Sequence, residues 1–554
     1  MWKNKIPIPT IRLLTILLLL IPTLHAADHE GGDGPPRKTQ RRILTNWDMS
    51  SFEQCLFYRR EKLSPESVQR RLEEAVDEHA AAQVDAFVHC VFIRFYSHLM
   101  GPSKVTNRAE RYRKASGVHV LDEAGIDFLK VLIDRCHQRD MEFIATLRMN
   151  SSHGNSNDFG QWFKEHPQYR LKGQVKVDYT HDAVRDAMLT FIGELLDGYD
   201  VDGIDFDWMR WTPAFPVGEG PQKAHLLTDF TRKARALLDE AARRRGGGRL
   251  VLGVRVPETM AECHYHGFDL ATWISEGFVD YVVPSDFNHV NFNTRVEDFA
   301  KLTAGTACKI YPALHPSPSD LDRNVHQLTQ ANYRAAAQNF YAFGADGFYA
   351  FNWMYHWDHR RQARTYTGPG YFWPAALGYL QALRDPEEVS QGDRHYLFGP
   401  RWRKGASPTG EQFSKYDSID LKRADADPQG TWPFRLAEEL SDPKLRATLH
   451  FKAVGLEEAE RLNIQVNGTP VPREFITRVI DPSGQNESQG RVLPPFYWYF
   501  IDLDRQTLAP AVVHGDNELT VRLIRPEAEG EPEGTVAVED LGAYVYVRRT
   551  PAAK

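Results

Sequence analysis

Short apolar runs alternate with amphipathic stretches across residues 43–351, and this alternation restricts the fold more than any other feature of the chain. The apolar runs have the length and composition of buried strands. They are Ile43–Asn46, Ala86–Phe95, Glu142–Leu147, Gly203–Asp207, Leu250–Val256, Val279–Val283, Lys309–Pro312 and Gly347–Phe351. The clearest helical stretches between them are Pro65–Ala82, Leu121–His137, Ala183–Leu196, His225–Arg244 and Asn332–Phe343. Eight alternations of strand and helix predict a (β/α)8 TIM barrel, an α/β fold.

The pattern changes after about residue 385, where helix signals become scarce. Alternating runs there predict the strands of a β-sandwich, namely Arg446–Phe451, Arg461–Val466, Trp498–Leu503, Glu518–Ile524 and Gly542–Arg548. The turn-forming pairs Asn467-Gly468 and Asp516-Asn517 lie between such runs. We therefore expect a catalytic barrel over residues 43–384 and a β-sandwich accessory domain over residues 385–554.

Residues 1–26 have the order of a cleaved secretory signal peptide. Lys3, Lys5 and Arg12 precede the apolar run Leu13–Pro22, and the segment ends on the small residue Ala26. The apolar run is too short to anchor the chain in a bilayer, and no Cys follows it to carry a lipid. Residues 27–42 are polar and predict a flexible linker. We expect a secreted or periplasmic protein with no membrane anchor after cleavage of the signal.

The composition is that of a globular protein, with 42% hydrophobic and 25% charged residues and a net charge of -7. Lys and Arg are spread along the chain, so no basic surface for a nucleic acid is predicted. The five cysteines are widely spaced without a C-x-x-C motif, which indicates buried thiols rather than a disulfide framework or a zinc site. The aromatic content of 12% suits a carbohydrate substrate, because flat rings stack on pyranose faces.

The fourth predicted strand carries the strongest site signal. Its two-residue period places Asp205 and Asp207 on one face, pointing into the barrel mouth where such barrels bind substrates. Two buried carboxylates repel each other and lose hydration unless a substrate, a cation or a proton compensates. The alternative is a structural role, in which one Asp only forms an ion pair with Arg210 or Arg255. We favour a functional role for the pair.

Glycosidic cleavage needs a carboxylic acid and a second carboxylate, and neighbouring strand ends offer candidates for the acid. Glu258 after strand five is the preferred proton donor, and Asp286 after strand six is the alternative. Asp207 is the expected nucleophile or base, with Asp205 one layer deeper. The expected substrate-binding residues are Asn46, Asp48, Arg148, Asn150, Arg210, Arg255, Asn352 and Trp353. For each of these residues taken alone, a structural role is the alternative to substrate binding.

His264 and His266 flank Tyr265 and, on an extended segment, would reach one metal ion. No third ligand stands at a suitable spacing, so we expect no metal and no other cofactor. A metal-assisted hydrolase or a lyase, sensitive to chelators, is the weakest of the alternatives.

Two resemblances follow from the fourth strand. Asp202, Gly203, Asp205 and Asp207 resemble the family 18 chitinase signature Asp-Gly-x-Asp-x-Asp-x-Glu, but Met209 stands where that family has its proton donor. The segment Gly198–Ile204 more closely resembles bacterial glycoside hydrolase-like barrels of the glycosyl hydrolase-like 10 type, many of which carry a secretory signal and a trailing β-domain. This resemblance implies a secreted glycoside hydrolase of unnamed substrate. The alternative is a sugar-binding barrel without catalysis, like the chitinase-like lectins.

Overall fold

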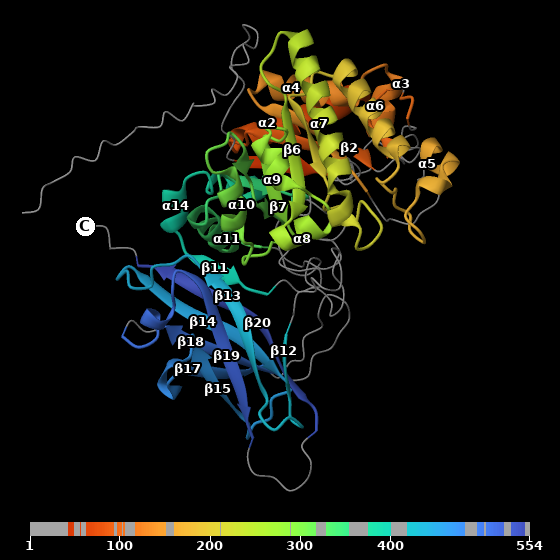
Figure 1. Ribbon diagram of the computed structural model, residues 1–554. Coiled ribbons are helices and arrows are strands. Elements are labelled where there is room, and N and C mark those ends of the chain that lie inside the picture. The colour runs from red at the N-terminus through yellow and green to blue at the C-terminus, as the bar shows by residue number, and fades with distance from the viewer. Residues whose placement is uncertain are drawn as a thin grey trace, which may run out of the picture.

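The computed structural model forms a helix-covered barrel half and a second half made of strands (Figure 1). It describes residues 43–48, 52, 56, 63–93, 97–101, 103–105, 117–150, 160–210, 212–287, 290–316, 328–353, 375–399, 418–481, 496–503, 506–525 and 533–548. The predicted signal peptide and linker lie outside these residues.

The barrel is built on a parallel sheet whose hydrogen-bonded order is β8-β7-β6-β5-β4-β2-β1-β10-β9. Its strands are β1 (Ile43–Trp47), β2 (Ala86–Ile93), β4 (Glu142–Arg148), β5 (Gly203–Asp207), β6 (Val251–Pro257), β7 (Tyr281–Ser285), β8 (Lys309–Ile310), β9 (Ala313–Leu314) and β10 (Phe348–Ala350). The short strand β3 (Ser97–His98) pairs antiparallel to β2.

The sheet closes through residues 309–314. This segment pairs with β7 through β8 and with β10 through β9, and Pro312 interrupts it between the two. Proline lacks the N–H that a continuous strand would need there. All eight predicted strands are present, and the predicted (β/α)8 barrel is confirmed.

The described helices are α2 (Pro65–Ala81), α3 (Gly117–Glu123), α4 (Phe128–Gln138), α5 (Gln161–Glu165), α6 (Asp182–Gly198), α7 (Gly220–Arg245), α8 (Met260–Tyr265), α9 (Leu270–Ser275), α10 (Val296–Thr303), α11 (Gln330–Ala342), α13 (Ala375–Gln381) and α14 (Pro386–Ser390). Within the described ranges, none of them is both long and apolar enough to cross a membrane.

Local signals explain where these helices begin and end. Ser64 caps α2 by accepting a hydrogen bond from the backbone N–H of Ser67 at 3.2 Å. The single helix predicted over Leu121–His137 is wrong, because α3 ends before Gly125, whose φ of 74° is left-handed. Asp127 then caps α4 through the backbone N–H groups of the next turn.

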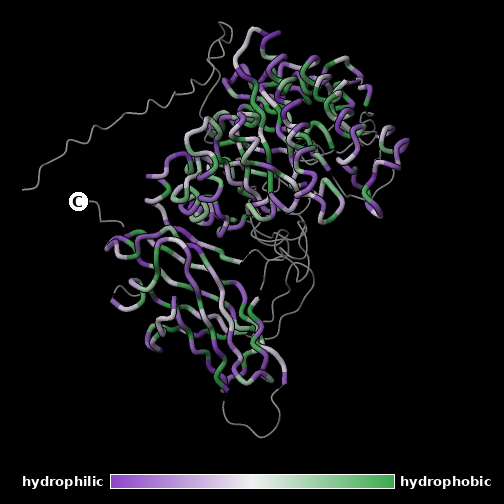
Figure 2. The backbone as a smooth tube through the Cα atoms, viewed as in Figure 1, coloured by the Kyte–Doolittle hydropathy of each residue, from purple (hydrophilic) through white to green (hydrophobic). Residues whose placement is uncertain are grey.

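The barrel strands bury side chains on both faces. Outward-facing residues pack against the helices in one large core, and inward-facing residues form a separate cluster. That inner cluster comprises Leu44, Ala86, Val88, Ile144, Val251, Tyr281, Val283, Tyr311, Ala313, Tyr349 and Phe351. Hydrophobic residues accordingly dominate the centre of the barrel half in Figure 2, whereas hydrophobic and hydrophilic residues alternate along the sandwich strands.

The second half contains two antiparallel sheets, as the sequence predicts. One has the order β11 (Arg394–Leu397), β20 (Thr535–Val547), β14 (Leu445–Val454), β18 (Phe496–Leu503) and β17 (Ile476–Asp481), with β12 (Ile419–Lys422) also on β20. The other has the order β13 (Gln429–Leu436), β19 (Gly515–Ile524), β15 (Arg461–Val466) and β16 (Thr469–Pro470). The division of the chain at residue 385 itself stays a prediction.

Only one of the two predicted turns forms as expected. Asn467 and Gly468, both with positive φ, join β15 to β16. The turn predicted at Asp516-Asn517 is wrong, because both residues belong to β19 and pair with β13. Asn517 instead closes the preceding turn, where its side chain bonds the backbone N–H and C=O of Val513, each at 2.8 Å.

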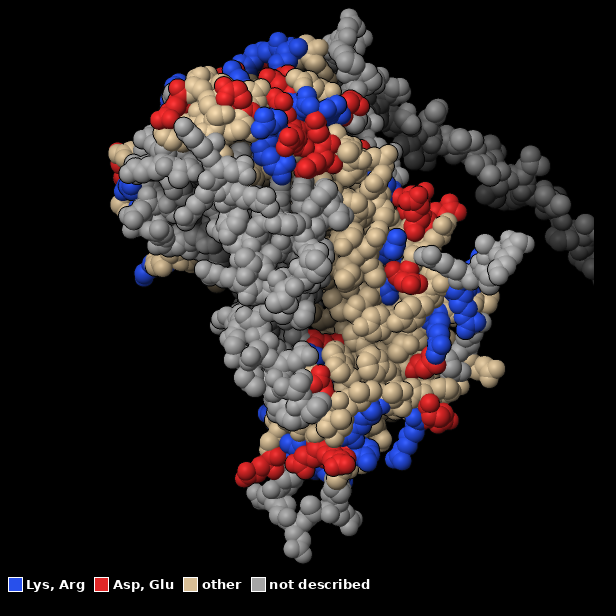
Figure 3. Space-filling model, turned by 180° about the vertical axis from the view of Figure 1, so that it is seen from behind, with Lys and Arg blue, Asp and Glu red and all other residues tan. Residues whose placement is uncertain are grey.

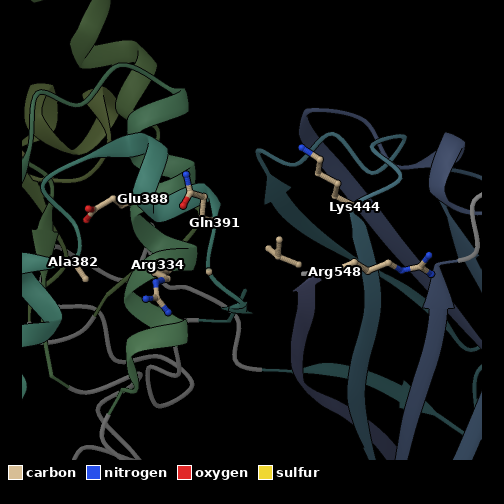
Figure 4. A pocket seen from close by; sticks show the side chains of 8 residues that line it. Arg334, Ala382, Glu388, Gln391, Lys444 and Arg548 are labelled. Atoms are coloured by element: carbon tan, nitrogen blue, oxygen red, sulfur yellow. The ribbon is translucent and has the colours of Figure 1, made fainter. Parts of the chain in front are cut away.

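Side chains join the two halves directly. Arg435 of β13 pairs with Glu297 of α10 at 2.7 Å, and Asn339 of α11 donates to the Arg435 carbonyl at 2.9 Å. A pocket of about 700 Å³ lies at this junction (Figure 4). Arg334 and Glu388 line it from the barrel half, and Lys444 and Arg548 line it from the sandwich half.

Candidate active site at the carboxyl end of the barrel

The fourth barrel strand, β5, carries both predicted aspartates, and they lie in two layers of different character. Asp205 occupies the lower layer, which is fully buried. It accepts hydrogen bonds from Thr146 Oγ1 at 2.6 Å and from Tyr281 OH at 2.9 Å. Tyr349 OH lies 3.4 Å from Asp205 and itself accepts a hydrogen bond from Asn46 Nδ2 at 3.0 Å. Five strands thus contribute to one polar network inside the barrel.

A glycine makes room for this network. A Cβ atom on Gly253 of β6 would lie 2.0 Å from the ring of Tyr281. The missing side chain lets the Tyr281 ring cross the barrel interior and reach Asp205. Burial raises the pKa of Asp205 to about 6, against the opposing effect of the Thr146 and Tyr281 hydrogen bonds.

Asp207 occupies the upper layer and forms an ion pair with Arg255. Its Oδ1 accepts a hydrogen bond from Arg255 Nη1 at 2.8 Å and another from the backbone N–H of Arg210 at 3.0 Å. Oδ2 accepts none from any residue that the structure describes. Among the described residues, Asp207 is therefore held through only one of its two carboxylate oxygens.

Arg255 is fully buried and is held from several sides. Its Nε donates to Ser285 Oγ at 3.0 Å, and its Nη2 donates to the carbonyls of Asp286 and Phe287, each at 2.8 Å. The guanidinium also lies 3.4 Å from the centre of the Phe351 ring. These contacts fix the guanidinium and, through it, the orientation of Asp207.

The two candidate proton donors have different surroundings. Glu258 is buried, and its carboxylate accepts hydrogen bonds from Asn291 Nδ2 at 2.6 Å and from Thr294 Oγ1 at 3.2 Å. Asp286 is linked to Arg255 by its carbonyl, and its carboxylate accepts the backbone N–H of Phe287. Arg255 thus connects Asp207 to Asp286, whereas the described hydrogen bonds of Glu258 lead to the loop after β7.

Two of the predicted substrate-binding residues form a second ion pair. Arg148 Nη2 lies 2.5 Å from Asp48 Oδ2, and both side chains are buried. Arg148 stands opposite Asp207 in the register of β4 and β5. This pair therefore lies at the level of Asp207, above Asp205.

Asn352 is the most unusual of the predicted residues. It is fully buried and has a φ of 51°, which non-glycine residues rarely adopt. Neither its amide nitrogen nor its amide oxygen has a hydrogen-bond partner within the described part of the chain. An unsatisfied buried amide destabilises a fold by about 1–3 kcal/mol, which makes a ligand-binding role worth testing.

Asn150 and Trp353 have contacts that stabilise the fold, whereas Arg210 lies next to Asp207 and donates to it through its backbone N–H. Asn150 bonds the backbone N–H and C=O of Val177, each at 3.0 Å, and so braces a loop. Trp353 is buried in the main core against Tyr333, with ring centres 5.1 Å apart. Arg210 lies over the Phe287 ring at 4.9 Å.

The sequence reasoning missed Thr146, Tyr281, Tyr349, Ser285 and Phe351. Side chains alternate between the two faces of each strand, and this alternation places these residues on the inward face with Asp205 and Asp207. It is the sequence signal that could have identified them. His264 and His266 do not lie on an extended segment, the arrangement in which both would reach one metal ion. His264 belongs to helix α8 and is exposed, while His266 caps that helix and is buried. Among the described residues, no cluster of His, Cys, Asp and Glu suits a metal ion.

Comparison with known families addresses the first part of the barrel. Residues 44–236 match the family model described as glycosyl hydrolase-like 10. The glycosyl hydrolase-like 10 match includes both aspartates of β5 and the Asp48–Arg148 pair. It ends before β6, so Arg255, Glu258, Asp286 and Asn352 lie outside it. A comparison with curated protein sequences gives no match.

Solved glycoside hydrolases are similar to the chain at low identity. A GH138 enzyme targeting pectin rhamnogalacturonan II has 11% identity and a TM-score of 0.38, over 64% of this chain and 40% of that enzyme. The PgaB (BpsB) glycoside hydrolase domain from Bordetella bronchiseptica has 12% identity and a TM-score of 0.38, over 59% of this chain and 100% of that domain. The GH36 α-galactosidase AgaB from Geobacillus stearothermophilus has 12% identity and a TM-score of 0.36, over 85% of this chain and 56% of that enzyme. Such values identify neither substrate nor mechanism.

Proposed function

We propose that this protein is a secreted glycoside hydrolase that cleaves glycosidic bonds in a poly- or oligosaccharide. The observation that supports this most is the state of Asp207 at the carboxyl end of β5. Arg255 and the Arg210 backbone hold Oδ1, and Oδ2 accepts no hydrogen bond from the described residues. A carboxylate held in this way is preorganised to attack an anomeric carbon or to activate a water molecule.

The proton donor in this proposal is Glu258, with Asp286 as the alternative. The donor must protonate the glycosidic oxygen as the bond breaks, from a position beside the other carboxylate. Glu258 follows β6, which pairs directly with β5, whereas Asp286 follows β7, one strand further away. This order keeps Glu258 as the first choice.

The sugar would be positioned by groups around this carboxylate. Asn352 has an amide that a sugar hydroxyl would satisfy, and Arg148, Asp48 and Arg210 lie at or beside the level of Asp207. Asp205, one layer deeper, would act on Asp207 through its charge rather than touch the substrate.

A sugar-binding barrel without catalysis is the second candidate, and Met209 favours it. The Met209 side chain is buried against Phe287 at the position where the chitinase signature has its acid. If neither Glu258 nor Asp286 can protonate a leaving group, the barrel would bind glycan without cleaving it.

Activity of the purified protein on a panel of glycans, with products identified by mass, tests the proposal. For an accepted glycan, Asp207→Asn should lower the rate by about 10²- to 10⁴-fold while binding persists, because the amide can neither attack nor act as a base. Glu258→Gln and Asp286→Asn identify the donor, as only one should cause a comparable loss. Asp200→Asn is the matched control, because the Asp200 side chain is 64% exposed and precedes β5.

Two results would count against the enzyme. Hydrolysis that survives Asp207→Asn, Glu258→Gln and Asp286→Asn would refute the site assignment. Glycan binding without turnover by the unaltered protein would favour the sugar-binding barrel. Secretion is tested separately, since the exported protein should begin at Ala27 by mass spectrometry of its N-terminus.

A further inference from the structure

The outer face of the β11–β20–β14–β18–β17 sheet carries a continuous row of flat side chains, which we call the aromatic strip. It consists of His395, His450, Trp498, Phe500, Tyr544 and Tyr546. His395 stacks on Tyr544 with ring centres 4.1 Å apart and planes at 21°. Tyr544 and Tyr546 are stacked at 16°, and Trp498 and Phe500 at 26°. His450 connects the two groups, 4.8 Å from Tyr544 and 5.8 Å from Trp498.

Strand register explains why these rings share one face. His395 stands opposite Tyr544, and His450 stands opposite Phe500. Gly542 lies opposite His450 on β20, and a Cβ there would be 2.5 Å from His450 Nε2. The glycine therefore leaves space for the His450 ring, whose Nε2 lies 3.0 Å from His395 Nε2. The rings span four adjacent strands, a width of about 14 Å at the usual strand spacing.

The aromatic strip has no net charge near neutral pH. Burial lowers the pKa of His395 to about 4 and that of His450 to about 3. Lys452, 5.2 Å from the Trp498 ring, is paired with Asp540 at 2.5 Å. Figure 3 views the molecule from behind and shows uncharged surface over part of the sandwich half, with charged side chains along its right side and lower rim.

We infer that the aromatic strip binds an uncharged polysaccharide through stacking of its rings on pyranose faces. Trp498, Phe500 and Tyr544 are partly exposed and Tyr546 is exposed, so apolar ring surface of the strip is accessible to the C–H faces of pyranoses. Charge complementarity favours a neutral glycan, because the strip offers no unpaired cation to a uronate chain. The strip is also fixed to the barrel, since Asn332 of α11 donates to the His395 carbonyl at 2.8 Å. The choice of a glycan as occupant rests on the proposed function.

Affinity electrophoresis of the full-length Asp207→Asn protein tests this inference without hydrolysis of the gel polysaccharide. The gels contain hydroxyethyl cellulose, galactomannan or, as an acidic glycan, polygalacturonate. We expect at least one neutral polysaccharide to retard the protein, and Trp498→Ala to weaken that retardation about fivefold to tenfold. Tyr546→Ala should act in the same direction and leaves folding intact, because this side chain is 45% exposed. Tyr497→Ala is the matched control, because it removes a half-buried ring from the same strand but from its other face.

Several outcomes would overturn the inference. The first is that neither neutral polysaccharide retards the protein. The second is that Trp498→Ala and Tyr546→Ala both leave the retardation unchanged. Retardation by polygalacturonate alone would exclude a neutral ligand. A dimer on size-exclusion chromatography that Trp498→Ala converts to a monomer would assign the strip to a second copy of the chain. If the unaltered protein hydrolyses no glycan but retardation still depends on Trp498, the inference about the strip is supported. Only the proposed enzyme function is then refuted.

Discussion

Asp205 should make the stability of the barrel depend on pH in a direction opposite to that of most carboxylates. Its pKa in the folded protein is about 6, whereas an Asp in an unfolded chain has a pKa near 3.9. Between these values the folded protein binds a proton that the unfolded chain has released. The free energy of unfolding therefore falls as the pH rises from about 4 to above 6.

The size of the effect follows from the difference between the two pKa values. A shift of about 2 pH units corresponds to about 3 kcal/mol, fully expressed once the pH exceeds the folded pKa. Asp205→Asn removes the titrating group but keeps an oxygen that accepts from Thr146 or Tyr281. The free energy of unfolding of the variant, minus that of the unaltered protein, should therefore rise by about 3 kcal/mol between pH 4 and pH 7.

Urea-induced unfolding followed by Trp fluorescence, at intervals between pH 4 and pH 7.5, measures this difference. Tyr281→Phe provides a second perturbation, because it deletes a donor that lowers the Asp205 pKa. Tyr281→Phe should move the midpoint of the pH dependence of stability to a higher pH. In a protein that also carries Asp205→Asn, Tyr281→Phe should cause no such shift. Parallel stability curves for the unaltered protein and Asp205→Asn would refute the reasoning. Such curves would mean that Asp205 ionises in the folded barrel as readily as in the unfolded chain.

Two further substitutions examine the same layers. Arg255→Met should destabilise the protein by about 3–5 kcal/mol, because Asp207 would remain as a buried charge without its ion pair; an unchanged melting temperature would contradict this. Gly253→Ala should cost about 1–3 kcal/mol, because the added methyl would collide with the Tyr281 ring. Adding Tyr281→Ala to Gly253→Ala should cost less than the sum of the two single effects, as double-mutant analysis of urea unfolding would show.

The barrel could be predicted from the sequence because each strand is buried on both faces. Continuous apolar runs such as Ala86–Ile93 mark such strands whatever their partners are. The strand predicted at Lys309–Pro312 contains β8 but ends before β9, because Pro312 divides this segment of the sheet in two. Helix ends were harder. The break at Gly125 depends on a positive φ that a helical hydrophobic pattern does not reveal.

The site was predictable along each strand but not across strands. The two-residue period was enough to group Asp205 with Asp207 and to propose Arg255 beside them, and the structure brings Asp207 and Arg255 to 2.8 Å. The hydrogen bonds of Tyr281 and Tyr349 to Asp205 depend on how the strands are staggered around the barrel. Trp353 shows the same limit, because the sequence does not reveal that its ring packs on Tyr333 in the core.

The two aspartates of β5 show how position within the barrel separates similar residues. Asp205 is enclosed by hydroxyl groups, no guanidinium of the described residues donates to it, and its pKa is raised to about 6. Asp207, two residues later, receives Arg255 and keeps one oxygen free of hydrogen bonds from the described residues. Such a division is what acid–base catalysis requires of neighbouring carboxyl groups. Because Asp205 is the deeper of the two, it suits the role of a titratable support for Asp207. The acid that reaches the substrate must then come from the end of β6 or β7, which makes Glu258 and Asp286 the decisive residues for the enzyme proposal.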